Sequence, residues 1–188
     1  MSEDYLIRNC APTLAGIKTG SLFTCPFENK AALLEEIRRI NRQFAGKGLR
    51  LLPLRFSEKK ALIYLYRPAR LQQDLTNEVA SQILQEQGYC MGNCQQCVQQ
   101  LGRKLRCQQD FPHEIGLFLG YPAEDVHGFI EKGPDCCKCT GCWKVYGDAE
   151  SARKTFARYK KCTKVYCDQW AKGQNLDRLT VSCRAARS

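Results

Sequence analysis

The chain has 188 residues, of which 44% are hydrophobic and 10% aromatic, enough to bury a core of its own. It contains 29 Lys and Arg against 19 Asp and Glu, and the resulting net charge of +10 is spread over both halves of the sequence. No apolar run approaches the ~20 residues of a membrane span, and Glu3 and Asp4 give an acidic start that is unlike a secretory signal. We therefore expect no membrane insertion and a cytoplasmic location.

The 13 cysteines raise the question of a disulfide framework. Such frameworks belong to exported proteins, whereas cytosolic thiols are normally kept reduced. Because the number is odd, complete pairing within the chain is also impossible. We expect reduced thiols, some of them binding a metal.

The first third of the chain predicts a small sheet with helices. A short helix begins at Ser2 and is expected to break at Pro12, and residues 22–25 form a strand. Asn29 caps a helix that lasts to Gly46, and residues 49–56 and 61–66 pair as a hairpin. Pro53 lacks a backbone donor, which places its strand at a sheet edge. A strand, a helix and a strand in succession predict a right-handed crossover and a mixed sheet.

The rest of the chain is mostly helical. One apolar stripe extends from Pro68 to Gly88, and further helices are expected at residues 93–106, 110–120 and 122–133. A thiol-rich loop and a short strand at 143–146 precede a long helix capped by Asp148, and a last strand is expected at 179–183. The predicted fold class is α/β (or α+β): a single compact domain, 1–188, with a small mixed β-sheet flanked by helices and a motif-rich segment at 107–147.

Three stretches carry a resemblance to a known family: residues 10–18 (CAPTLAGIK), 111–122 (FPHEIGLFLGYP) and 143–148 (WKVYGD). On these motifs the chain resembles domain-of-unknown-function family 3793, an uncharacterised bacterial family, over nearly its whole length. The resemblance implies a compact cytosolic bacterial protein and no particular activity. Cys94, Cys97 and most of the 136–142 cysteines are not part of the family pattern.

The leading functional hypothesis is a metal ion or redox cofactor held by cysteines. The C-x-x-C spacing lets two thiolates reach one metal ion, and the chain has two such pairs with spare thiols nearby. The candidate ligands are Cys94, Cys97, Cys139, Cys142, Cys136 and Cys137. Zinc and an iron–sulfur cluster are both compatible with this set, although the gap between the pairs exceeds that of zinc ribbons. Thiol–disulfide exchange and buried structural thiols are the alternatives.

A second hypothesis is a small enzyme. His113 and Glu114 open a helix, where they could transfer protons, and Lys18 could activate the thiol of Cys10. The structural alternative is that Glu114 and His113 only cap the helix. Around them lie the densest aromatic and ionisable residues of the chain, and we expect Tyr121, Trp143, Lys144 and Tyr146 to bind a cofactor or a small-molecule or redox partner.

A third hypothesis is nucleic-acid binding through the basic helix 149–171. Six Lys and Arg side chains lie on one side of this helix between Arg153 and Lys164. A solvated helix face explains the same pattern, so this function is not favoured. Residues 114–130 also resemble a helix-turn-helix, but Glu124 and Asp125 on the second helix would repel phosphates, so a packed helical corner explains this segment better.

Overall fold

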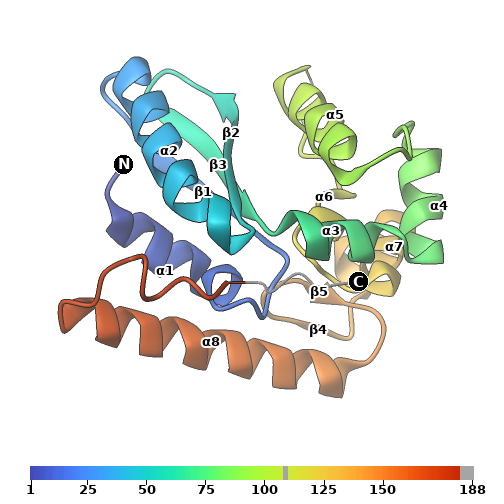
Figure 1. Ribbon diagram of the computed structural model, residues 1–188. Helices are drawn as coiled ribbons and strands as arrows, with labels where there is room; N and C mark the ends of the chain where they lie inside the picture. Colours follow the sequence, from blue (N-terminus) through green and yellow to red (C-terminus); the bar gives the residue numbers. More distant parts are fainter. Residues whose placement is uncertain (108–109, 183–188) are drawn as a thin grey trace, which may run out of the picture. The chain divides into compact units, whose positions relative to one another are not determined.

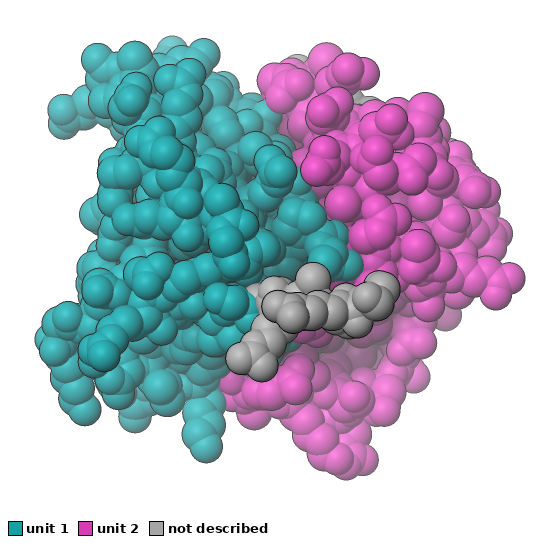
Figure 2. All heavy atoms as spheres, viewed as in Figure 1, with its two compact units in different colours: residues 1–69, 161–188 teal, residues 70–160 magenta. Residues whose placement is uncertain are grey.

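The structure is a computed structural model in which residues 1–107 and 110–182 are described. Their contacts fall into two compact units, which Figure 2 colours separately. Unit 1 comprises residues 1–69 and 161–188, and unit 2 comprises residues 70–160. Helices predominate, and the strands form two small sheets, so the predicted α/β class is confirmed. The single domain remains a prediction.

Unit 1 is built on a three-stranded antiparallel sheet with the order β1-β3-β2 (Figure 1). Its strands are β1 (Gly20–Pro26), β2 (Arg50–Phe56) and β3 (Lys60–Tyr66). The hairpin and the edge position of the Pro53 strand are confirmed, and the register shifts between Pro53 and Arg55. The sheet is not mixed in its pairing, because β3 lies between β1 and β2 and pairs antiparallel with each.

Helices α1 (Glu3–Leu14) and α2 (Lys30–Phe44) share an apolar core with this sheet. The short helix η1 (Ala45–Lys47) directly follows α2 in the chain. Asn29 caps α2 as predicted, accepting a hydrogen bond from the Ala32 amide at 3.1 Å. At the sheet edge, Asn41 of α2 donates to the carbonyl of Leu51 and accepts from its amide, at 2.8 and 2.9 Å. The edge backbone is thereby satisfied within the unit.

The break expected at Pro12 is wrong, since α1 continues through it to Leu14. The carbonyl of Pro12 then accepts hydrogen bonds from Ile17 and Lys18 in the following turn. The carbonyls of Thr13 and Leu14 accept from the buried guanidinium of Arg67, at 2.7 and 2.8 Å. The same two carbonyls also accept from the amides of Gly16 and Val181, so Arg67 adds a second donor to each at the end of α1.

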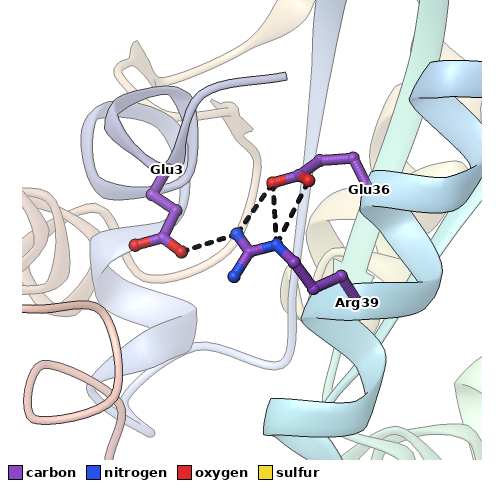
Figure 3. A network of polar contacts seen from close by, with 3 residues as sticks. All are labelled: Glu3, Glu36 and Arg39. Atoms are coloured by element: carbon purple, nitrogen blue, oxygen red, sulfur yellow. Dashed lines mark hydrogen bonds and ion pairs between the residues drawn. The ribbon is translucent and has the colours of Figure 1, made fainter.

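A polar network joins the two helices of unit 1 (Figure 3). Arg39 of α2 contacts Glu36 one turn away and Glu3 at the start of α1, both at 2.8 Å. Hydrogen bonding from Arg39 lowers the pKa of Glu36 below its ordinary value. The network therefore stabilises the contact between α1 and α2 while Glu36 is ionised.

Unit 2 begins at Arg70, inside helix α3 (Pro68–Leu75). It continues with α4 (Glu78–Glu86) and α5 (Cys94–Cys107). The stripe predicted as one helix from Pro68 to Gly88 is two, because Asn77 caps a new helix by accepting from the Ala80 amide at 3.2 Å. The unit continues with α6 (Ile115–Phe118), α7 (Ala123–Lys132), η2 (Pro134–Cys136), β4 (Cys139–Thr140) and β5 (Lys144–Val145).

Helix α8 (Ala149–Ala171) begins in unit 2 and ends in unit 1. Asp148 caps it as predicted, accepting from the amides of Glu150 and Ser151 at 2.9 and 3.1 Å. Beyond it, residues 179–182 form a turn and irregular chain where a strand was expected, and Cys183 lies outside the described residues. None of the helices in the described chain has the length and apolar character to cross a membrane.

Candidate functional site

The segment from Asp110 to Gly147 folds into a compact corner of unit 2. A loop leads into the short helix α6, and Gly120 turns the chain with a positive φ of 73° before α7 begins. Helix α7 packs on α6 and on β5. Gly116 permits this packing, because a Cβ there would lie 2.7 Å from Val126 Cγ2 and 3.0 Å from Tyr121 Cδ2.

The buried carboxylate of Asp125 on α7 organises the strand side of this corner. It accepts hydrogen bonds from the indole N–H of Trp143 at 2.6 Å and from the amides of Tyr146 and Gly147 at 2.7 and 2.8 Å. Only 3% of Asp125 is exposed. Three donors compensate the cost of burying this charge. Trp143 is therefore held in one orientation.

Aromatic rings surround Trp143. Tyr121 stacks on it with centroids 4.9 Å apart, and Phe156 of α8 meets it edge to face at 4.5 Å. Such pairs contribute about 0.5–1.5 kcal/mol beyond their buried area. Burial is the main cause that raises the pKa of Tyr121 to about 12, with a smaller effect of Cys142, so its phenol is neutral at physiological pH.

These rings border a cavity of about 680 Å³, the aromatic cavity. Its aromatic walls are Phe111, His113, Tyr121, Phe129 and Trp143, and its ionisable residues besides His113 are Asp110, Asp125 and Lys144. His113 packs its ring edge-on against Phe129, with centroids 5.0 Å apart. The Lys144 ammonium donates to the carbonyl of Pro134 at 2.8 Å.

Four of the residues predicted from the sequence therefore line one cavity: His113, Tyr121, Trp143 and Lys144. Tyr146 does not line it, and its hydroxyl donates to the carbonyl of Gly133. The sequence reasoning missed Phe111, Phe129 and Asp125 as members of the site. The helical spacing of Phe129 is that of a core residue, and nothing in the local sequence distinguishes a cavity wall from a core residue.

Glu114 lies in a second polar arrangement beside the aromatic cavity. Its Oε1 accepts from the Tyr89 hydroxyl at 2.9 Å and from the Lys104 ammonium at 2.8 Å. Lys104 also donates to the carbonyl of Gln87 at 2.8 Å and lies 4.4 Å from the centre of the Tyr89 ring. Burial, followed by the charge of Glu114, raises the pKa of Tyr89, which therefore remains a donor. No side-chain cap hydrogen bond from Glu114 to α6 is formed.

Glu114 and Lys104 line a cavity of about 460 Å³, the Glu114 cavity. Gln87, Ile130 and residues 110–113 complete its wall. Residues 110–113 line both cavities. Each cavity has one buried carboxylate in its wall, Asp125 in the aromatic cavity and Glu114 in the Glu114 cavity, and the aromatic cavity has more aromatic side chains around it.

Cys10 and Lys18 belong to unit 1, whereas His113 and Glu114 belong to unit 2, so neither unit contains the predicted catalytic group as a whole. Cys10 is fully buried in the core of unit 1. Burial raises its pKa well above the ordinary thiol value, and the opposing effect of Lys18 is smaller. An activated thiol nucleophile is accessible and has a lowered pKa, whereas Cys10 is buried and has a raised one.

The six predicted metal ligands do not form a metal centre within residues 1–107 and 110–182, where no group of three or more His, Cys, Asp or Glu could hold an ion. Cys94 and Cys97 are buried along α5. Cys136, Cys137, Cys139 and Cys142 lie in and beside the β4–β5 hairpin, exposed or half-buried. The C-x-x-C spacing was compatible with a metal, but the described residues around the two pairs supply no group of ligands for one.

On α8, the side chains of Arg153, Lys154, Arg158, Lys160, Lys161 and Lys164 are exposed, as the basic-face prediction requires. Lys154 pairs with Glu150 at 2.7 Å, and the guanidinium of Arg158 lies 6.0 Å from the centre of the Tyr159 ring. Exposed pairs of this kind contribute little to stability. This face is equally compatible with a solvated helix.

A family model with the description "Protein of unknown function (DUF3793)" matches residues 6–180, which confirms the resemblance noted in the sequence. No curated protein and no solved structure matches the chain.

Proposed function

The chain belongs to the family described as protein of unknown function, DUF3793, and we propose that its unit 2 binds a small organic molecule with a flat ring. The observation that carries this proposal is the gathering of five aromatic side chains around one cavity of about 680 Å³. Ligand pockets of proteins commonly measure roughly 300–1,000 Å³ and combine apolar walls with a few polar groups.

The chemistry of the walls supports a flat ligand. Aromatic rings stack on planar molecules and bury a large apolar area with little loss of conformational freedom. Trp143 and Tyr121 are already fixed by Asp125 and by each other, so the cavity does not need to reorganise before binding. An ammonium carries three N–H groups, and Lys144 uses one of them on Pro134. Within the described residues Lys144 has no second acceptor, so we expect its other N–H groups to serve a polar substituent of the ligand.

An organic cofactor with a flat ring is one ligand that would satisfy both this proposal and the cofactor binding predicted from the sequence. An ion or an iron–sulfur cluster draws no support from the described thiols. The cytoplasmic location remains a prediction from the sequence. Nucleic-acid binding by α8 and catalysis by His113 stay predictions without a supporting contact.

Tryptophan fluorescence tests the proposal. The chain has two tryptophans, so Trp170→Phe leaves Trp143 as the single reporter. We expect flat heteroaromatic compounds to change its emission and to shift the backbone amide signals of the lining residues. Aliphatic compounds of equal size should do neither. Phe129→Leu should weaken binding about tenfold by removing a ring face.

Phe27→Leu is the matched control, because Phe27 belongs to unit 1 and pairs with Phe56 there. It should leave the affinity unchanged. The proposal would be abandoned if a diverse set of flat heteroaromatic compounds left the lining amides and the Trp143 emission of the folded protein unchanged.

A further inference from the structure

We infer that the Glu114 cavity is a recognition site for a cationic nitrogen group of the amidinium or guanidinium type. The inference concerns a different recess from the aromatic cavity and does not depend on the function proposed for it. The two carboxylate oxygens of Glu114 have unequal surroundings.

The first oxygen, Oε1, accepts both hydrogen bonds that the carboxylate receives, from Tyr89 and from Lys104. Within residues 1–107 and 110–182, no donor is bonded to Oε2. The same part of the chain contains no fully buried side-chain nitrogen or oxygen without a partner. Oε2 therefore keeps some solvent contact, although only 3% of the Glu114 side chain is exposed. Glu114 lines the cavity, and we take this recess as the route by which a ligand reaches Oε2.

The carboxylate is fixed in place. Lys104 is anchored by the carbonyl of Gln87 and by the face of the Tyr89 ring as well as by Oε1. A buried carboxylate with one oxygen held by two donors has little freedom to turn. Its remaining oxygen is thus positioned before a ligand arrives, which lowers the entropic cost of binding.

The charges of the wall select the ligand. Among the described residues of the wall, Glu114 and Asp110 are acidic, and the ammonium of Lys104 is engaged by Glu114 and Gln87. An anion would face the open oxygen and be repelled. A neutral donor could bind, but a hydrogen bond between a carboxylate and a cationic N–H is roughly twice as strong. The two neighbouring N–H groups on one edge of a planar amidinium or guanidinium can both point at this single open oxygen, in a rigid geometry that an ammonium group lacks.

Benzamidine and benzamide make a matched pair of probes, since they share the ring and the planar head and differ in charge. We expect benzamidine to bind the full-length protein at least about tenfold more tightly than benzamide at pH 8, by titration of amide chemical shifts. The shifts should centre on Gln87, Lys104, Glu114 and Ile130, which line the Glu114 cavity and not the aromatic cavity. Equal affinities, or benzamidine shifts confined to other residues, would overturn the inference without any variant.

Glu114→Gln should remove the preference for benzamidine, because it replaces the charge and keeps the shape. Tyr89→Phe should retain the preference, since it removes a donor from Oε1 only. Phe129→Leu separates the two proposals, because it weakens flat ligands in the aromatic cavity and should leave the ratio of benzamidine to benzamide affinity unchanged. A folded Glu114→Gln protein that still prefers benzamidine would refute the role of Glu114.

Discussion

The indole N–H of Trp143 donates a hydrogen bond of 2.6 Å to the buried carboxylate of Asp125. The two residues are 18 positions apart, one on α7 and one beside β5, and the bond joins the helical and strand parts of the motif-rich segment. Because the same carboxylate also accepts two backbone amides, it couples the position of the hairpin to the orientation of an aromatic wall.

Asp125→Asn should destabilise the protein by about 2–4 kcal/mol. The amide of asparagine has one acceptor oxygen, so a donor would face either the indole N–H or the two backbone amides, and the charge assistance is lost. Urea unfolding, followed by Trp143 fluorescence in a Trp170→Phe background, measures the change. Glu131→Gln, at an exposed position of the same helix, is the control and should change the free energy of unfolding by less than about 0.5 kcal/mol.

Gly116→Ala should cost about 1–3 kcal/mol, because its Cβ would overlap Val126 and Tyr121 and force α6 away from α7. The displaced Tyr121 would also lose its stacking on Trp143, so ring-current shifts of both residues should change in the NMR spectrum. Gly46→Ala provides the comparison. A Cβ at Gly46 meets nothing within 4 Å, and that variant should be neutral or slightly stabilised.

The network of Arg39 with Glu36 and Glu3 predicts a pH-dependent stability difference (Figure 3). Since the pKa of Glu36 is lowered in the folded protein, its contribution is fully present above the unfolded value of about 4.3 and is lost as pH falls through the folded value. Arg39→Met should therefore cost about 1 kcal/mol at pH 7 and progressively less below pH ~4. Arg38→Met, which removes an exposed 3.6 Å pair with Glu35, should show no such trend in urea unfolding.

Thiol alkylation distinguishes buried from accessible cysteines. At pH 8, iodoacetamide should modify the exposed Cys90, Cys107 and Cys136 at least about a hundredfold faster than Cys10. Burial both shields Cys10 and raises its pKa. Peptide mapping by mass spectrometry measures the rates, and unfolded protein should label at all positions equally. Rapid modification of Cys10 in the folded protein would restore it as a candidate nucleophile.

Local sequence signals determined most of the secondary structure. Asn29 and Asp148 mark helix starts by the side-chain oxygen that each offers to free amides, and Pro53 marks an edge strand by its missing donor. These effects act within a few residues, so they can be inferred without coordinates. Where two local signals compete, as at Pro12 and Asn77, the element boundary was misplaced.

The sequence also determined where the candidate site lies, because aromatic and ionisable residues concentrate between Phe111 and Tyr146. Only the tertiary structure decided how they are used. Asp125 orients Trp143, Tyr89 and Lys104 hold one oxygen of Glu114, and the paired cysteines assemble no metal centre among the described residues. These outcomes depend on contacts between residues far apart in the chain, which local spacing does not encode, whereas packing and the satisfaction of buried polar groups fix them in the folded units.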